Sequence, residues 1–335
     1  MKPKSIFTGK ASLIAEGCTL QRMSGKILVG TASWTDKSLI QSGRFYPAEA
    51  KTPEARLQFY ASEFPLVEVD SSYYGLPSER NAALWVDRTP AGFTFDVKAF
   101  ALFTQHPVPP RVLPKDLREQ LPDKLRSKAH LYDSDLPAAI RDSLWERFSA
   151  ALLPLESAGK LGVVLFQFPP WFLPGSDSRR YIKEIKQRLP QYTPAIEFRS
   201  PSWFQDGDSE RTLRFLSDHD LPYVCVDEPQ GTRASVPPVV AVTASLALVR
   251  FHGRNDQAWA KRNVSVAEKY DYLYTSEELQ AWVPSVRWLA AETSEVHLLM
   301  NNCREDKAVR NARELASLLG QLPPQPPTSP QPRLL

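Results

Sequence analysis

The stretch Leu161–Phe168 (LGVVLFQF) decides the fold. It is an almost unbroken apolar run of strand length, which is the pattern of a parallel strand buried on both faces. A helical pattern precedes it at Pro137–Ser157, and another follows it at Ser178–Leu189. This succession predicts parallel strands joined by crossover helices, provided that it recurs along the chain.

The same kind of run recurs on both sides of this stretch. The further runs are Lys26–Ala32, Leu66–Asp70, Phe93–Lys98, Ala195–Arg199, Pro222–Asp227, Leu246–His252 and Glu295–Asn301. Helical patterns are predicted at Thr52–Phe64, Ser78–Arg88, Ser209–Asp218, Ser276–Thr293 and Glu305–Leu319, with a capping box at Thr275 and Glu278. Eight strands alternating with helices predict an α/β fold of the TIM type, a (β/α)8 barrel.

Two segments depart from a regular barrel, and two more lie outside it. Gln230–Ser245, between strands six and seven, has no helical period and predicts an irregular crossover. Phe100–Asp135, after strand three, is a long proline-rich insertion and a candidate lid over the carboxyl ends of the strands. We therefore expect an N-terminal extension (1–25), a barrel domain (26–320) and a disordered proline-rich tail (321–335).

Composition places the chain among ordinary globular proteins. Its 335 residues are 42% hydrophobic and 24% charged, with a net charge of +3. That charge is too weak to predict an anionic membrane as partner, and it gives nucleic acid little support. Cys18, Cys225 and Cys303 form no CxxC pair, so neither a disulfide framework nor a zinc site is indicated. We expect a cytoplasmic protein without a membrane span; the oligomeric state is not indicated.

Polar side chains gather where the predicted strands end. Glu68 with Asp70, Asp96 with Lys98, Glu197 with Arg199, and Arg250 with His252 are each two residues apart, so each pair shares a strand face. Strand ends of this barrel build active sites. The candidate catalytic residues are Glu68, Asp70, Lys98, Glu197, Asp227 and His252; the candidate binding residues are Trp34, Tyr73, Gln167, Arg199, Trp203, Arg250, Arg254, Tyr272 and Asn301.

A structural explanation competes with this functional one. Alternating acids and bases can form a static ring of salt bridges, and the loop aromatics can pack the insertion onto the barrel. Lys98 can form a Schiff base, but its neighbour Asp96 predicts an ion pair instead. His106, in the insertion, can reach the pocket when the lid closes, whereas His130, His219 and His297 are expected at the surface or in the core.

The strand-end motifs, taken in order, resemble those of a known family. They are GTASW (30–34), FYP (45–47), VEVDSSYYGLPS (67–78), FDVKA (95–99), VLFQFPPWF (164–172), AIEFRSPSWF (195–204), VRFHGRN (249–255), YDYLY (270–274) and NNC (301–303). From about residue 27 to 319 the chain resembles the YecE-like family, domain of unknown function 72. The resemblance implies a TIM-type barrel with a polar pocket and no established activity. Family members often have His where this chain has Cys303.

The residue types favour an enzyme that acts on an anionic substrate. Arginine forks match phosphate or carboxylate groups, which points to a sugar phosphate, a nucleotide or another phosphoester. Glu197 or Glu68 would be the general base, Lys98 or Arg199 would stabilise negative charge, and His252 would shuttle a proton. The reaction would be a phosphoesterase-like hydrolysis, an isomerisation or a lyase reaction.

Two alternatives to metal-free catalysis stay open. Glu68, Glu197, Asp227 and His252 are ligand types suited to a divalent metal, although no HxH or HExxH spacing is present. No GxGxxG or phosphate-loop motif occurs, so no nucleotide cofactor is indicated. The other alternative is a non-catalytic binder of a nucleic-acid strand or of a small anionic ligand at the barrel mouth.

Overall fold

The computed structural model describes residues 4–5, 24–205, 207–232, 234–261 and 264–321. The predicted proline-rich tail lies outside these residues, apart from Gln321. The predicted N-terminal extension lies outside them as well, apart from residues 4–5 and 24–25. Both segments therefore stay predictions. Among the described residues, no helix combines the length and apolar character that a membrane span requires.

The described chain forms the predicted barrel. Its strands are β2 (Lys26–Ala32), β3 (Leu66–Val69), β4 (Thr94–Lys98), β5 (Leu161–Gln167), β6 (Pro194–Glu197), β7 (Val224–Asp227), β9 (Leu246–Phe251) and β10 (Glu295–Met300). All pairs are parallel, in the order β6-β5-β4-β3-β2-β10-β9-β7. The edge strands β6 and β7 meet through a single bridge from Ile196 to Tyr223, where the Ile196 N–H donates to the Pro222 carbonyl at 2.8 Å.

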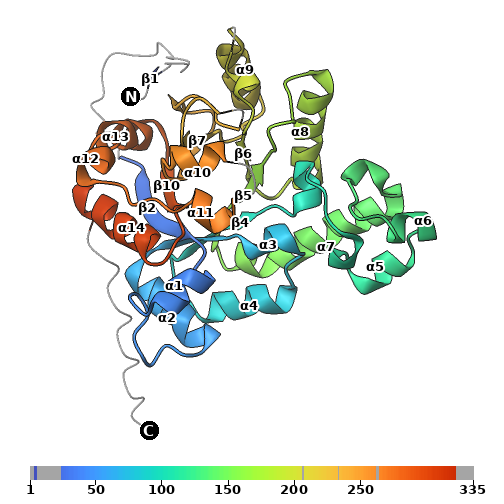
Figure 1. Cartoon of the computed structure of the whole chain (residues 1–335), viewed down its shortest axis with the longest axis horizontal. Coiled ribbons are helices and arrows are strands. Elements are labelled where there is room, and N and C mark those ends of the chain that lie inside the picture. The colour runs from blue at the N-terminus through green and yellow to red at the C-terminus, as the bar shows by residue number, and fades with distance from the viewer. Residues whose placement is uncertain (1–3, 6–23, 206, 233, 262–263, 322–335) are drawn as a thin grey trace, which may run out of the picture.

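Helices surround the strands (Figure 1). The longer ones are α2 (Pro53–Glu63), α4 (Glu79–Asp87), α7 (Ala138–Ser157), α8 (Ser176–Arg188), α9 (Asp208–Asp218), α13 (Val283–Glu292) and α14 (Lys307–Leu318). The shorter ones are α1 (Lys37–Ser42), α3 (Ser71–Tyr74), α5 (Lys115–Glu119), α6 (Asp123–Arg126), α10 (Asp256–Ala260), α11 (Val266–Lys269) and α12 (Ser276–Gln280), with 3-10 turns at Ala101–Thr104, Pro110–Val112, Asp133–Asp135 and Pro201–Trp203. The prediction of one helix over Ser276–Thr293 is wrong, because Pro284 cannot continue a helix and instead sits in the first turn of α13.

The capping box and the irregular crossover are confirmed. The Thr275 hydroxyl accepts from the Glu278 N–H at 3.3 Å, and the Glu278 carboxylate accepts from the Thr275 N–H at 2.9 Å. The described residues between β7 and β9 contain no helix. They form the short strand β8 (Val239–Val240), which pairs with β1 (Lys4–Ser5).

The insertion after strand three is not a lid over the mouth, which corrects the expectation. Phe103 stacks on Trp145 of α7, with 3.8 Å between the ring centroids. Asp116 of α5 forms an ion pair with Arg147 of α7. Figure 1 shows α5 and α6 beyond α7, at one edge of the molecule. Apolar residues such as Leu117 are buried there, so the insertion extends the helix layer outward. Near its start, His106 lies at the site described below.

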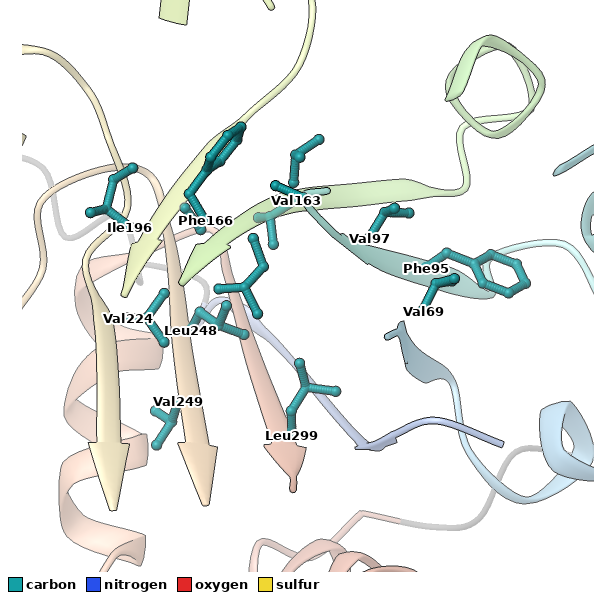
Figure 2. Close-up of a cluster of buried hydrophobic side chains, with 14 of the residues drawn as sticks. Val69, Phe95, Val97, Val163, Phe166, Ile196, Val224, Leu248, Val249 and Leu299 are labelled. Carbon is teal, nitrogen blue, oxygen red and sulfur yellow. The ribbon is translucent and has the colours of Figure 1, made fainter. Parts of the chain in front are cut away.

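The two faces of the strands differ in chemistry. Figure 2 shows buried apolar side chains from β3, β4, β5, β6, β7, β9 and β10, among them Phe95. Phe95 stacks on Trp85 of α4 at 6.0 Å and therefore faces the helix layer. Because strand side chains alternate, the flanking Asp96 faces the barrel interior. Asp96 there accepts from His297 at 2.9 Å and from the Val163 N–H at 2.9 Å. The interior of this barrel is therefore ionic as well as apolar.

Candidate functional site at the carboxyl ends of the strands

Arg250 lies in the barrel interior between two glutamates from other strands. Its Nε and Nη2 donate to the Glu68 carboxylate at 2.9 and 2.7 Å, and its Nη1 donates to Glu197 Oε2 at 2.7 Å. All three side chains are fully buried. Burial raises the pKa of Glu68, and the Arg250 guanidinium offsets part of that rise. The predicted gathering of strand-end charges is thus present, but here it takes the form of a closed ion cluster.

Glu197 is surrounded by donors and has little capacity to accept a proton. Besides Arg250, it accepts from Gln167 Nε2 at 2.6 Å and His252 Nε2 at 3.1 Å, and Arg199 Nε lies 3.1 Å away. Burial alone would raise the pKa of Glu197, but Arg250, His252 and Arg199 hold it well below its usual value. Glu197 is thus a carboxylate with several donors, and its role as general base stays a prediction.

His252 is held in one neutral form. Its Nε2–H faces Glu197, and its Nδ1 accepts from the Asn301 amide at 2.8 Å. Burial, followed by the charge of Arg199, lowers the pKa of His252 to about 3, although Glu197 acts in the opposite direction. Both ring nitrogens are engaged and the ring is inaccessible to solvent. His252 therefore positions Glu197, and the expected proton-shuttle role does not fit.

Lys98, at the end of β4, differs from these paired groups. Among the described residues, no carboxylate lies within 4.0 Å of its Nζ and no hydrogen bond to Nζ is formed; the Tyr73 ring centroid lies 4.7 Å away. The predicted ion pair with Asp96 is wrong, because Asp96 turns to His297 deeper in the barrel. Burial and the charge of Arg250 lower the pKa of Lys98 to about 8. The negative charges of Glu68, Glu197 and Asp70 act in the opposite direction and raise it. Lys98 is therefore the unpaired amine of the site.

Asp70 and Cys303 lie at the same end of the barrel. Burial raises the pKa of Asp70. The charge of Lys98 and a hydrogen bond from Ser33 lower it and offset part of that rise. Ser33 has a φ of 90°, a costly conformation for a residue with a side chain. The Cys303 thiol donates to the Ala32 carbonyl at 2.9 Å, and burial, with Asp36 and Asp70, raises its pKa well above the usual value. Cys303 thus stays protonated, whereas Asp70 has a shifted carboxyl group beside Lys98.

Aromatic rings cover the Lys98 side of the site. The His106 ring lies 5.4 Å from Tyr73 and 5.7 Å from Trp171 between ring centroids, and it hydrogen-bonds the Thr104 hydroxyl at 2.9 Å. Burial lowers the pKa of His106 to about 4, and the positive charges of Lys98 and Arg199 contribute. Tyr74 and Trp171 remain 64% and 58% exposed at the edge of this aromatic wall.

Arg199 leads to a glutamate that the sequence interpretation missed. It forms an ion pair with Glu228 and donates to the Tyr270 hydroxyl at 3.2 Å, and its guanidinium lies 5.1 Å from the Trp259 ring centroid. Burial raises the pKa of Glu228 to about 7, although the positive charge of Arg199 lowers it. The signal was available, because Glu228 directly follows Asp227 at a strand end. The sequence alone does not show that Glu228 pairs with Arg199, so it did not indicate a role for Glu228.

Three candidates form a separate cluster. Asp227 accepts from Arg254 at 2.8 and 2.6 Å, from the Tyr274 hydroxyl at 2.8 Å and from the Trp282 ring N–H at 2.7 Å. Tyr272 donates to Glu278 at 2.7 Å, and Arg254 donates to the same Glu278 oxygen at 3.1 Å. These contacts satisfy Asp227 and Arg254 within the protein. A pocket of about 270 Å³ adjoins the cluster, away from Lys98.

The predicted binding residues Trp34 and Trp203 both pack against neighbouring aromatic rings and are buried. Trp34 packs edge-on against Trp85 of α4 at 5.7 Å and is 6% exposed. Trp203 is fully buried, stacks on Phe198 at 4.2 Å and donates its ring N–H to the Phe172 carbonyl at 2.7 Å. Both follow strand ends, but both rings turn toward the helix layer.

The described residues do not assemble the predicted metal ligands. No group of three or more His, Cys, Asp or Glu side chains in the described part of the chain is placed to hold a metal ion. Glu68, Glu197 and Asp227 are each bound to an arginine, and His252 has both nitrogens engaged. Their ligand atoms are therefore already engaged, chiefly by arginines and by the Asn301 amide.

Comparison with known proteins identifies the family. The family model "Protein of unknown function DUF72" matches residues 28–334. The chain is 33% identical to the UPF0759 protein YunF of Bacillus subtilis (strain 168) over 297 residues, which cover 88% of this chain and 94% of the relative. A DUF72 family crystal structure from Enterococcus faecalis V583 aligns with a TM-score of 0.71 at 27% identity, covering 88% of this chain and 96% of that one. A DUF72 family crystal structure from Thermotoga maritima MSB8 aligns with a TM-score of 0.69 at 28% identity, covering 88% of this chain and 100% of that one. The chain belongs to the DUF72 family, as the resemblance of its strand-end motifs predicted.

Proposed function

We propose that the protein is an enzyme that carries out acid–base chemistry on a small anionic substrate, with a sugar phosphate as the leading candidate. The observation that carries this proposal is the unpaired Lys98, whose pKa is lowered to about 8. A group that titrates near neutral pH can both accept and give a proton under physiological conditions. Asp70, whose pKa is raised, is the second proton-transfer group. Glu68 and Glu197 serve as fixed charges.

The anionic character of the substrate is supported by the electrostatics at His106. Lys98 and Arg199 both disfavour protonation of this ring, and no carboxylate offsets them there. The space near His106 is therefore at positive potential, which favours a phosphate or carboxylate group. The aromatic wall of Tyr73, His106 and Trp171 offers ring faces of the kind that pack against sugars. Arg250 and Arg254 are removed from the predicted anion site, because carboxylates already occupy them.

The test is a thermal-shift screen with sugar phosphates, free sugars and nucleotides, followed by calorimetry on each ligand that shifts Tm. We expect a sugar phosphate to raise Tm, and Lys98→Met and Asp70→Asn to weaken its binding about tenfold or more. Lys26→Met is the matched control. Lys26 is an exposed lysine at the amino end of β2, whereas Lys98 lies at the carboxyl end of β4. Equal binding by the Lys98 and Lys26 variants would contradict the proposal.

A non-catalytic binder is the second candidate, and the exposed rings of Tyr74 and Trp171 favour it. Exposed aromatic rings beside cations suit stacking on the bases of a nucleic-acid strand. Binding of a strand weakens steeply as salt is raised, because counterions are released, whereas a small enclosed ligand responds far less. A titration of a single-stranded oligonucleotide at two salt concentrations distinguishes the candidates.

A further inference from the structure

We propose that Lys98 is a nucleophile that forms a Schiff base with a carbonyl substrate carrying an anionic group, such as a phosphorylated ketose or aldose. This inference rests on the proposed function and specifies its substrate class. A lysine can attack a carbonyl carbon only when its amine is neutral and accessible. Every other cation described above is committed to a carboxylate, and Lys98 is the exception.

The surroundings of Lys98 lower the pKa of its amine toward neutral pH and leave the residue partly exposed. Lys98 is a partly exposed residue at the end of β4, and its Nζ lies over the Tyr73 ring. Arg250, which the two buried glutamates fix in place, adds a positive charge that disfavours a second ammonium nearby. An ion pair with Asp96 would have kept Lys98 charged, and His297 removes that partner. An unpaired, partly exposed lysine whose pKa is lowered is the kind of amine that can act as a nucleophile.

The reaction balances with the groups present. The neutral Lys98 amine attacks the carbonyl carbon, and a proton moves from nitrogen to oxygen to give a carbinolamine. Asp70, whose pKa burial raises, gives a proton to the departing hydroxyl group, so that one water leaves and an iminium ion forms. Hydrolysis consumes one water and restores the lysine. The anionic group of the substrate would lie toward His106, where Lys98 and Arg199 set a positive potential.

Trapping with sodium borohydride tests this step, because hydride reduces the iminium bond to a stable secondary amine. The full-length protein is incubated with dihydroxyacetone phosphate, glyceraldehyde 3-phosphate or pyruvate, with neutral dihydroxyacetone as comparison, and the adduct is located by peptide mass spectrometry. We expect one adduct, on Lys98, about tenfold more abundant with an anionic carbonyl compound than with the neutral one. Its yield should rise as the pH passes through about 8.

Variants separate the possible failures. Lys98→Arg keeps the charge but not the nucleophile, so it should abolish the adduct; Lys98→Met should do the same, and Lys26→Met should leave it unchanged. A Tm shift by an anionic carbonyl compound without an adduct on Lys98, or labelling spread evenly over exposed lysines, would overturn the Schiff base and leave the proposed function standing. Neither a Tm shift nor an adduct with any of the three anionic compounds would overturn both.

Discussion

Replacement of Arg250 by methionine tests whether the charge cluster is a structural unit. The variant removes the one guanidinium that, among the described residues, donates to the fully buried Glu68. Glu197 loses one donor but keeps Gln167, His252 and Arg199. The cost is therefore that of one orphaned buried carboxylate, about 3–5 kcal/mol of the free energy of unfolding. Since domains are stable by about 5–15 kcal/mol, the variant should still fold.

The assay is guanidinium unfolding followed by tryptophan fluorescence, with Arg250→Met, Glu68→Gln and the double variant compared at two pH values. The double variant should be more stable than Arg250→Met alone, because no unpaired charge is left. In Arg250→Met, loss of the guanidinium raises the pKa of Glu68 further above that of the unfolded chain, so protonation favours the folded state as the pH falls. The deficit should therefore be smaller at about pH 5 than at about pH 8. A deficit independent of pH, with no rescue by Glu68→Gln, would refute this reasoning.

Three further predictions concern the barrel interior and the helix layer. In Gly162→Ala the new Cβ would lie 2.3 Å from an Asp96 carboxylate oxygen, so thermal unfolding should show a loss of about 1–3 kcal/mol, whereas Gly175→Ala, with nothing within 4 Å, should change little. Burial alone would lower the pKa of His297, but Asp96 raises it to about 9; its stabilising contribution is complete below the unfolded value of 6.5 and lost as the pH rises through about 9. His297→Gln should thus flatten the fall in unfolding free energy across that range, and an unchanged slope would contradict the assignment. Trp203→Ala should cost about 3–5 kcal/mol in denaturant unfolding while ligand affinity in calorimetry stays constant; a selective loss of affinity would return Trp203 to the site.

The fold could be predicted because each strand is a continuous apolar run and most connections carry a helical period. The same alternation that gives the strands also placed Glu68, Glu197, Arg250 and His252 in one cluster, and their contacts confirm it. What the sequence could not supply is the distance across the barrel. Whether an arginine binds a ligand or a glutamate depends on strands far apart in the chain, as with Arg250 and Glu68, 182 residues apart.

Residues on loops were harder to place for a different reason. Strand alternation fixes a direction only within the strand, so it said nothing of Trp34 or Trp203 beyond the strand ends. The long insertion posed the same problem, because its attachment to α7 depends on contacts such as Phe103 with Trp145. By contrast, the break in the helix over Ser276–Thr293 was within reach, because Pro284 marks it.

The single bridge between β6 and β7 bears on how freely the chain could be reconnected. The first and last strands of the barrel, β2 and β10, are paired from Lys26 with Glu295 to Thr31 with Met300, and the Gln321 side chain donates to the Ile27 carbonyl at 2.7 Å. The two ends of the described barrel are thus adjacent. A circular permutant that joins residues 321 and 26 by a short linker, and starts between β6 and β7, would lose β1 and its pairing with β8 but keep every strand pair of the barrel sheet. The chain would be cut only in the connection between β6 and β7, two strands that a single bridge from Ile196 to Tyr223 joins.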